Sequence, residues 1–276
     1  MSSDSKKQNG FSQSHSGRNS RLEQRRPEKL GFVLSGGGAR GAYQAGVLKG
    51  LVELVEETPG SLPLSVYTGI SAGAINACYL AAFAENPVEA SRRLADMWSN
   101  ITSEQVIRTD PFSLTRMGLR WLRDASLGGM TKINKARSLL DTSPLRQLIR
   151  SHIPFDKIAE NLRRGHFESL SISAMNYTTS TSIAFVQSQK KVEMWDRSRR
   201  KSQEDLITED HVMASAAIPL FFPPVKVGGD HYGDGCLRNT APVSPAIHMG
   251  ATRLVVVSVR RPDSAMPLNL EPTYEP

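Results

Sequence analysis

The chain of 276 residues contains little cysteine and no long hydrophobic run. Its two cysteines, Cys78 and Cys236, make neither a disulfide framework nor a CxxC metal site. The longest apolar stretches lie near 74–84 and 254–259, well short of the ~20 residues that a membrane-spanning helix needs. No apolar segment of the signal-peptide type follows the initial Met. These absences predict a cytoplasmic protein without a membrane-spanning helix.

The excess of positive over negative charge is also small outside the N-terminus, although the formal net charge of the chain is +7. Residues 1–29 hold seven Lys and Arg against three Asp and Glu, and almost no aliphatic side chains. Such a segment cannot bury enough apolar surface to offset the entropy of ordering it. We therefore interpret 1–29 as a disordered basic arm, and the net charge gives little reason to expect a nucleic-acid partner.

From residue 30 onward, the hydrophobic pattern is that of a folded domain. Strand patterns at 30–35 and 65–71 are each followed by a helical pattern, at 42–57 and 72–85. This order favours a parallel sheet with right-handed crossovers, and we predict an α/β fold of three α/β/α layers around a central, mostly parallel sheet. In the first helix, apolar side chains recur at helical spacing: Tyr43, Val47, Leu51 and Leu54.

The second half of the chain should complete this domain, which we place at 30–262. Strands are expected at 169–177, 181–188 and 191–196, a helix at 208–217, and a buried strand at 253–259. Residues 263–276 form a Pro-rich tail without any period. A domain that ends one strand before such a tail is unusual, which favours a truncated chain.

A glycine-rich turn, Gly36–Gly41 (GGGARG), connects the first strand to the first helix. It matches the G-x-G-x-x-G dinucleotide pattern, but the second strand offers no acidic residue for a ribose, and Ala42 stands where a P-loop requires Lys. What remains is a set of backbone N–H groups at a helix N-terminus, directed at negative charge such as a developing oxyanion. A nucleotide- or phosphate-binding protein remains the alternative.

The second strand ends in a G-x-S-x-G motif, with Ser71 at its centre and Gly69 and Gly73 on either side. A strand-to-helix junction is the context that a nucleophile elbow requires. The nucleophile sits there in a strained turn, so the residues two positions away must be small. An N-cap serine in a glycine-rich turn would explain Ser71 alone, but not its combination with the upstream glycines.

A serine nucleophile needs a base, and the histidines offer no convincing one. Only His248 follows a suitable acid, Asp234, and it lies in an expected helix, so a triad is possible but poor. Asp234 itself stands between Gly233 and Gly235 on a turn after short strands, where the backbone can present its carboxylate to a cleft. A simple Asp-Gly turn would explain it equally well when taken alone.

The motifs GGGARG, GISAG and DG, with ASAAIPLFFPPV before the DG, together resemble the patatin-like phospholipase family over about Leu30 to Arg261. That resemblance implies a serine lipid acyl hydrolase with a Ser-Asp dyad and no metal or organic cofactor. It makes Ser71 the nucleophile and Asp234 the base. It also assigns the oxyanion hole to Gly36, Gly37, Gly38, Ala39 and Arg40. Cys236 departs from the Gly or Ala that usually follows the DG.

The expected partner is a lipid ester at a membrane surface, and a catalytically silent lipid-binding domain is a further alternative. Residues 111–124 place Arg116, Arg120 and Arg123 opposite an apolar face, as a helix at a lipid interface or on a protein core would. The basic run 190–201, with Trp195, is expected to be a solvated hairpin rather than a nucleic-acid site. Five apolar side chains are expected first in the core and second in an acyl pocket: Met213, Ile218, Leu220, Phe221 and Phe222.

Overall fold

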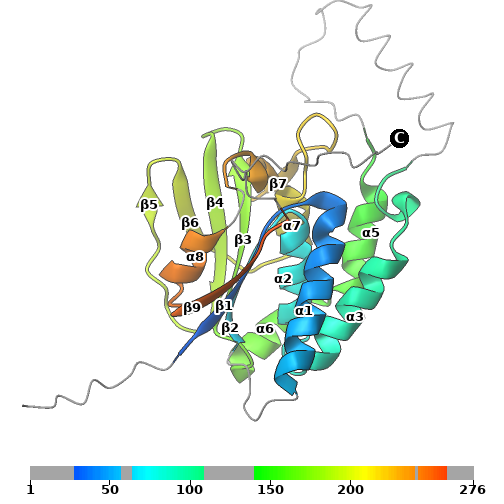
Figure 1. Cartoon of the computed structure of the whole chain (residues 1–276). Coiled ribbons are helices and arrows are strands. Elements are labelled where there is room, and N and C mark those ends of the chain that lie inside the picture. The colour runs from blue at the N-terminus through cyan, green and yellow to red at the C-terminus, as the bar shows by residue number, and fades with distance from the viewer. Residues whose placement is uncertain (1–27, 57–63, 109–139, 240–241, 260–276) are drawn as a thin grey trace, which may run out of the picture.

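Figure 1 shows a sheet whose two faces carry different helices. The computed structural model describes residues 28–56, 64–108, 140–239 and 242–259. Its strands are β1 (Leu30–Leu34), β2 (Leu64–Ile70), β3 (Ser169–Asn176), β4 (Thr181–Ser188), β5 (Asp196–Arg197), β6 (Arg200–Glu204), β7 (Val225–Val227), β8 (Asp230–Asp234) and β9 (Arg253–Val257). Its α-helices are α1 (Gly41–Glu56), α2 (Ala72–Ala82), α3 (Pro87–Asn100), α5 (Ser143–His152), α6 (Phe155–Arg164), α7 (Glu209–Ser215) and α8 (Val243–His248).

The sheet has the strand order β5-β6-β4-β3-β2-β1-β9, and the β7-β8 hairpin joins it where β8 pairs with β3. The four strands β9, β1, β2 and β3 run parallel to one another. β4 is antiparallel to β3, and β6 is parallel to β4. The predicted central, mostly parallel sheet is confirmed.

Alternate residues of the central strands enter two separate cores. Phe32 and Tyr67 belong to the larger core, whereas their neighbours Val33 and Val66 belong to the smaller one. This alternation follows from the two-residue period of a strand, which sends successive side chains to opposite faces of the sheet. In Figure 1, α1, α2, α3, α5 and α6 lie on one side of the sheet and α8 on the other, which confirms the three-layer fold.

The central helix of the larger core is α2. All eleven of its residues are buried, because it packs on β2 and is covered by α3 and α6. A helix that is hydrophobic all round is stable only in such a place. Its first residue follows directly on Ser71, so the best-packed helix of the fold fixes the position of that serine.

Three expectations from the sequence are wrong in detail. On α1 the buried stripe is one residue out of step with the expected one, so Tyr43 and Leu54 are 60% and 66% exposed while Leu48 is buried. The expected strand at 191–196 is a strand only at Asp196, where β5 begins.

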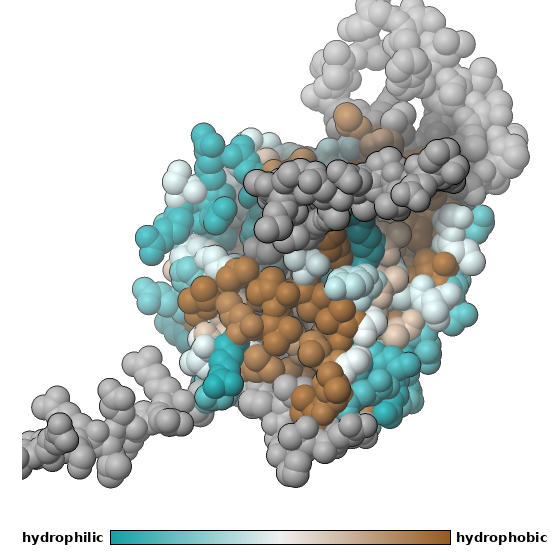
Figure 2. Space-filling view, viewed as in Figure 1, coloured by the Kyte–Doolittle hydropathy of each residue, from teal (hydrophilic) through white to brown (hydrophobic). Residues whose placement is uncertain are grey.

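The strand expected to be buried at 253–259 is β9, which lies at the edge of the described sheet. Its residue Val256 is exposed, and so is Ile247 of α8. Figure 2 shows an apolar area on this side of the molecule. Within the described part of the chain, no helix combines the length and apolar character that crossing a bilayer requires.

Candidate active site

Ser71 occupies a strained turn between β2 and α2. Its backbone φ of 54° and ψ of −125° lie where a residue with a side chain is uncommon, at a cost of about 1–3 kcal/mol. The flanking glycines permit the turn. A Cβ on Gly69 would lie 2.2 Å from the carbonyl oxygen of Gly73, and a Cβ on Gly73 would lie 2.2 Å from that of Leu34. The elbow therefore has no room for side chains at either position.

The backbone of this turn is held by Ser215 at the end of α7, a residue that the sequence analysis missed. The N–H of Ser71 donates to Ser215 Oγ at 2.9 Å, and that hydroxyl donates to the carbonyl oxygen of Ser173 at 2.6 Å. Ser71 and Ser215 are both buried. Ser215 lies within the ASAAIPLFFPPV segment, but nothing in the sequence indicates that its partner is 144 positions away.

Asp234 ends β8 and is buried beside the elbow. Its N–H donates to the carbonyl oxygen of Ala217 at 2.8 Å, and its carboxylate accepts the N–H of Cys236 at 2.8 Å. Burial raises the pKa of Asp234, and hydrogen bonds from Cys236 and from the Ser71 side chain oppose this rise. The structure thus places the Ser71 side chain close enough to Asp234 to stabilise its carboxylate.

His248, the base of the alternative triad, is engaged elsewhere. Its Nδ1 donates to the carbonyl oxygen of Ser244 at 2.8 Å, and its ring stacks on Trp195 with the centroids 4.4 Å apart. Trp195 itself is buried in the smaller core. In the described part of the chain, no hydrogen bond or ion pair joins a histidine to Ser71 or Asp234.

The glycine-rich turn packs directly against Ser71 and Cys236. A Cβ on Gly36 would lie 2.0 Å from Cys236 Sγ and 3.1 Å from Ser71 Cβ, so the turn can approach this closely only without a side chain there. Gly38 has a φ of 55°, which favours glycine. Within the described residues, no hydrogen bond engages the backbone N–H of Gly37 or Gly38. These two N–H groups therefore have no hydrogen-bond partner in the described part of the chain.

Only some residues of the expected oxyanion hole line the cavity that contains Ser71. Gly38 and Ala39 line the same cavity as Ser71, whereas Gly37 and Arg40 do not line it. The Arg40 side chain is exposed, and its Nη1 donates to the carbonyl oxygen of Val259 at 3.4 Å. The structure therefore directs the guanidinium of Arg40 toward the chain beyond β9.

A buried chain of hydrogen bonds connects this turn to the cavity wall, and the sequence analysis missed it. Trp98 Nε1 donates to Asn76 Oδ1 at 2.6 Å, Asn76 Nδ2 donates to Gln44 Oε1 at 3.0 Å, and Gln44 Nε2 donates to the carbonyl oxygen of Ser35 at 2.6 Å. Gln44 and Asn76 are fully buried polar residues on α1 and α2. Satisfied buried networks of this kind fix a single geometry, here that of the residue preceding Gly36.

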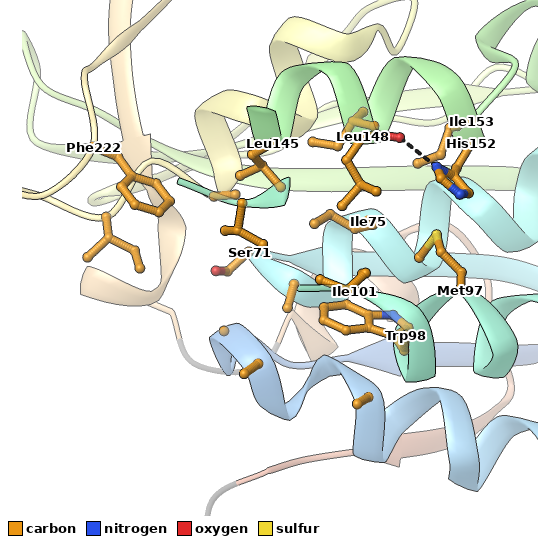
Figure 3. A pocket seen from close by; sticks show the side chains of 18 residues that line it. Ser71, Ile75, Met97, Trp98, Ile101, Leu145, Leu148, His152, Ile153 and Phe222 are labelled. Atoms are coloured by element: carbon orange, nitrogen blue, oxygen red, sulfur yellow. Dashed lines mark hydrogen bonds between the residues drawn. The ribbon is translucent and has the colours of Figure 1, made fainter. Parts of the chain in front are cut away.

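An apolar cavity of about 330 Å³ extends from Ser71 between α2, α3 and α5. In Figure 3, Ser71 lies between Phe222 at one end of the cavity and Met97 and His152 at the other. Its volume falls in the ordinary range for small-molecule sites, about 300–1,000 Å³. Such a cavity suits the hydrocarbon part of a substrate whose carbonyl group reaches Ser71.

The five apolar residues expected in the core or in an acyl pocket have three different fates. Met213 is in the core, and Ile218 and Phe222 line the cavity. Leu220 and Phe221 are exposed, Leu220 by 78%, so the core expectation is wrong for both. α7 ends at Ser215, Pro219 keeps the helix from resuming, and Leu220 has a φ of 69°, so the chain changes direction between Ile218 and Phe222.

Several expectations fall on residues outside the described ranges: most of the basic arm, the amphipathic segment 111–124 with its three arginines, and the Pro-rich tail. Within those ranges, no group of three or more His, Cys, Asp and Glu side chains is arranged to hold a metal ion. The basic run 190–201 includes the hairpin formed by β5 and β6 at one edge of the sheet.

The contact between Gly36 and Cys236 yields a testable prediction. Gly36→Ala should displace the glycine-rich turn, and kcat should fall by roughly 100- to 1,000-fold, the usual cost of losing one oxyanion donor. In a Cys236→Ala background the obstructing sulfur is gone, so the same substitution should cost much less. Ester hydrolysis by the parent, both single variants and the double variant measures this coupling. Equal losses in both backgrounds would contradict it.

The comparison with family models identifies one family for most of the chain. The sequence model of the patatin-like phospholipases matches residues 32–247. No curated protein matches the chain. Among solved structures, VipD from Legionella pneumophila is similar with 18% identity and a TM-score of 0.41, covering 77% of this chain and 47% of VipD. Human GIVD cytosolic phospholipase A2, in complex with methyl gamma-linolenyl fluorophosphonate, is similar with 18% identity and a TM-score of 0.33, covering 59% and 23%. The chain therefore spans about half of VipD and about a quarter of the human protein.

Proposed function

The chain belongs to the patatin-like phospholipase family, and from that premise we propose that it hydrolyses lipid acyl esters with Ser71 as nucleophile and Asp234 as base. The observation that carries the proposal is the position of the buried Asp234 carboxylate beside Ser71, which occupies a strained strand-to-helix turn. A buried carboxylate with a raised pKa is a suitable proton acceptor, because a base works best when its pKa lies near the working pH.

In the first half of the reaction, Asp234 takes the proton of Ser71 Oγ while that oxygen attacks the acyl carbonyl carbon. The backbone N–H groups of Gly37 and Gly38 stabilise the resulting oxyanion. When the tetrahedral intermediate collapses, the ester C–O bond breaks and the protonated Asp234 returns its proton to the leaving alcohol. The products of this half are an acyl-enzyme on Ser71 and a lysolipid or other alcohol.

In the second half, Asp234 takes a proton from a water molecule that attacks the acyl-enzyme. Collapse of this intermediate releases the fatty acid and returns the proton to Ser71 Oγ. The apolar cavity beside Ser71 receives the acyl chain, and Ser215 keeps the turn in place through its bond to the Ser71 N–H. The substrate is a lipid at a membrane surface, to which the protein binds peripherally.

The proposal is tested by incubating the protein with phospholipid vesicles and measuring released fatty acid and lysophospholipid by mass spectrometry. We expect both products in equal amounts from the parent protein, and neither from Ser71→Ala. Vesicle binding without any product would instead support a silent lipid-binding domain. Heat released on mixing with NAD or ATP, without product, would support the nucleotide alternative.

A further inference from the structure

At its end away from Phe222, the apolar cavity beside Ser71, here called the acyl cavity, shares its wall with a second hollow. Four residues line this end and also line the second hollow, of about 260 Å³, on the far side: Met97, Ile101, Leu148 and His152. We call these four residues the partition. Figure 3 shows Met97 and His152 at this end of the cavity.

The two sides of the partition differ in chemistry. On the side of Ser71, the cavity near the partition is lined by apolar side chains such as Ile75 and Ile153. The second hollow is lined, besides the partition itself, by Arg93, Asp96, Asn100 and Gln105. A hydrocarbon chain therefore gains from each methylene that it places before the partition, and gains little from methylenes that would lie beyond it.

The partition is held in place by its surroundings. Met97 and Leu148 are buried, and His152 Nδ1 donates to the carbonyl oxygen of Leu148 at 2.9 Å, which fixes the ring at the end of α5. α5 is in turn tied to α7 by ion pairs, including Arg150 Nε to Glu209 Oε2 at 2.7 Å. Two of the four side chains, Met97 and Leu148, are therefore held by burial, and the exposed His152 is held by its bond to α5.

We propose that the partition sets the longest acyl chain that this enzyme accommodates, so that its four side chains determine chain-length specificity. The inference rests on the proposed function, because it assumes that the acyl chain lies in the cavity beside Ser71. It goes further by assigning the selection of the substrate to residues that do not touch the reacting atoms.

For a series of p-nitrophenyl esters, kcat/KM should rise about fourfold with each added methylene while the chain fills the apolar cavity. Once the chain reaches the partition, kcat/KM should level off or fall. In Leu148→Ala, kcat/KM should keep rising beyond that length, though by less than fourfold per methylene, because the truncated side chain joins the cavity to the partly polar second hollow. This change should appear mainly in KM, since Ser71 and Asp234 are untouched.

Leu145→Ala is a matched control on the same helix. Leu145 is also buried and lines the acyl cavity, but it does not line the second hollow. The control removes the same atoms and enlarges the cavity without opening the partition, so the chain length at which kcat/KM levels off should stay that of the parent. Equal shifts in Leu145→Ala and Leu148→Ala would overturn the assignment, because any added volume would then suffice.

Ile101→Phe tests the same wall in the opposite direction and serves if Leu148→Ala does not fold. Ile101 follows α3 and is only partly buried, so a larger side chain is tolerated there. The plateau should then move to shorter chains, and an unchanged profile in this variant would overturn the inference. Labelling of the parent by a short alkyl fluorophosphonate distinguishes a failure of the proposed function from a failure of the role assigned to the partition. Failure to label Ser71 refutes the proposed function, whereas labelling with an unchanged profile refutes only the role of the partition.

Discussion

Replacing Ser71 with alanine is expected to lower the rate of ester hydrolysis by about 10⁶-fold, to the level left by binding and the oxyanion hole alone. Deletion of Oγ removes the only atom that can form the acyl-enzyme. The protein should still fold, because alanine fits the space of serine, and the bond from the residue-71 N–H to Ser215 Oγ does not involve the side chain. Hydrolysis of p-nitrophenyl esters and thermal melting measure the two effects.

Ser71→Gly is the matched control for this variant. It removes the same oxygen but also the Cβ, and glycine adopts a φ of 54° without strain. It should be as inactive as Ser71→Ala and should melt at a higher temperature. Turnover by either variant within a few-fold of the parent, in a preparation free of other esterases, would contradict the assignment of Ser71.

Asp234→Asn should lower the rate by about 10⁴-fold, as the loss of a carboxylate in a hydrolytic site does elsewhere. The amide still accepts the N–H of Cys236 but can no longer take the proton of Ser71. His248→Ala should keep nearly full activity, because that ring is stacked on Trp195 and bound to Ser244. If His248→Ala were the inactive variant and Asp234→Asn the active one, the base would be wrongly assigned.

The raised pKa of Asp234 adds a pH dependence to this prediction. The base works only as a carboxylate, so kcat/KM should fall on acidification at a pH above the ordinary Asp value of about 3.9.

Between the unfolded and folded pKa values of Asp234, the folded state binds more protons, so the contribution of Asp234 to stability falls as the pH rises through this window. Asp234→Asn should therefore be more resistant to urea than the parent at pH 8, with the difference vanishing below the unfolded pKa.

The sequence predicted the parts of the fold that depend on local pattern and short motifs. The alternation of strands and helices over 30–85 is enough to indicate a parallel sheet, and each turn carries a motif with a physical reason for its glycines. The face of α1 could not be predicted, because Tyr43 and Leu54 have the same period as the buried stripe beside them. Whether β9 is buried depends on which strand lies beside it, which no pattern within β9 reveals.

In the candidate site, too, the sequence predicts residues whose constraints are local and misses residues that depend on other elements. Ser71 and its two glycines stand out in the sequence because their constraints lie within five residues. Ser215, Gln44 and Asn76 do not, because each acts through a partner on another element. A polar residue in an apolar helix pattern, as Gln44 and Asn76 are, is the only signal that could have drawn attention to the buried network.

The most direct test of the account is covalent capture of the nucleophile. The parent protein is treated with an alkyl fluorophosphonate, digested, and its peptides are weighed by mass spectrometry, with Asp234→Asn and Ser71→Ala treated in parallel. The account predicts one adduct, on the peptide that contains Ser71, formed far more slowly in Asp234→Asn and absent in Ser71→Ala. An adduct on another residue, or complete loss of lipid hydrolysis while Ser71 stays unmodified, would contradict it.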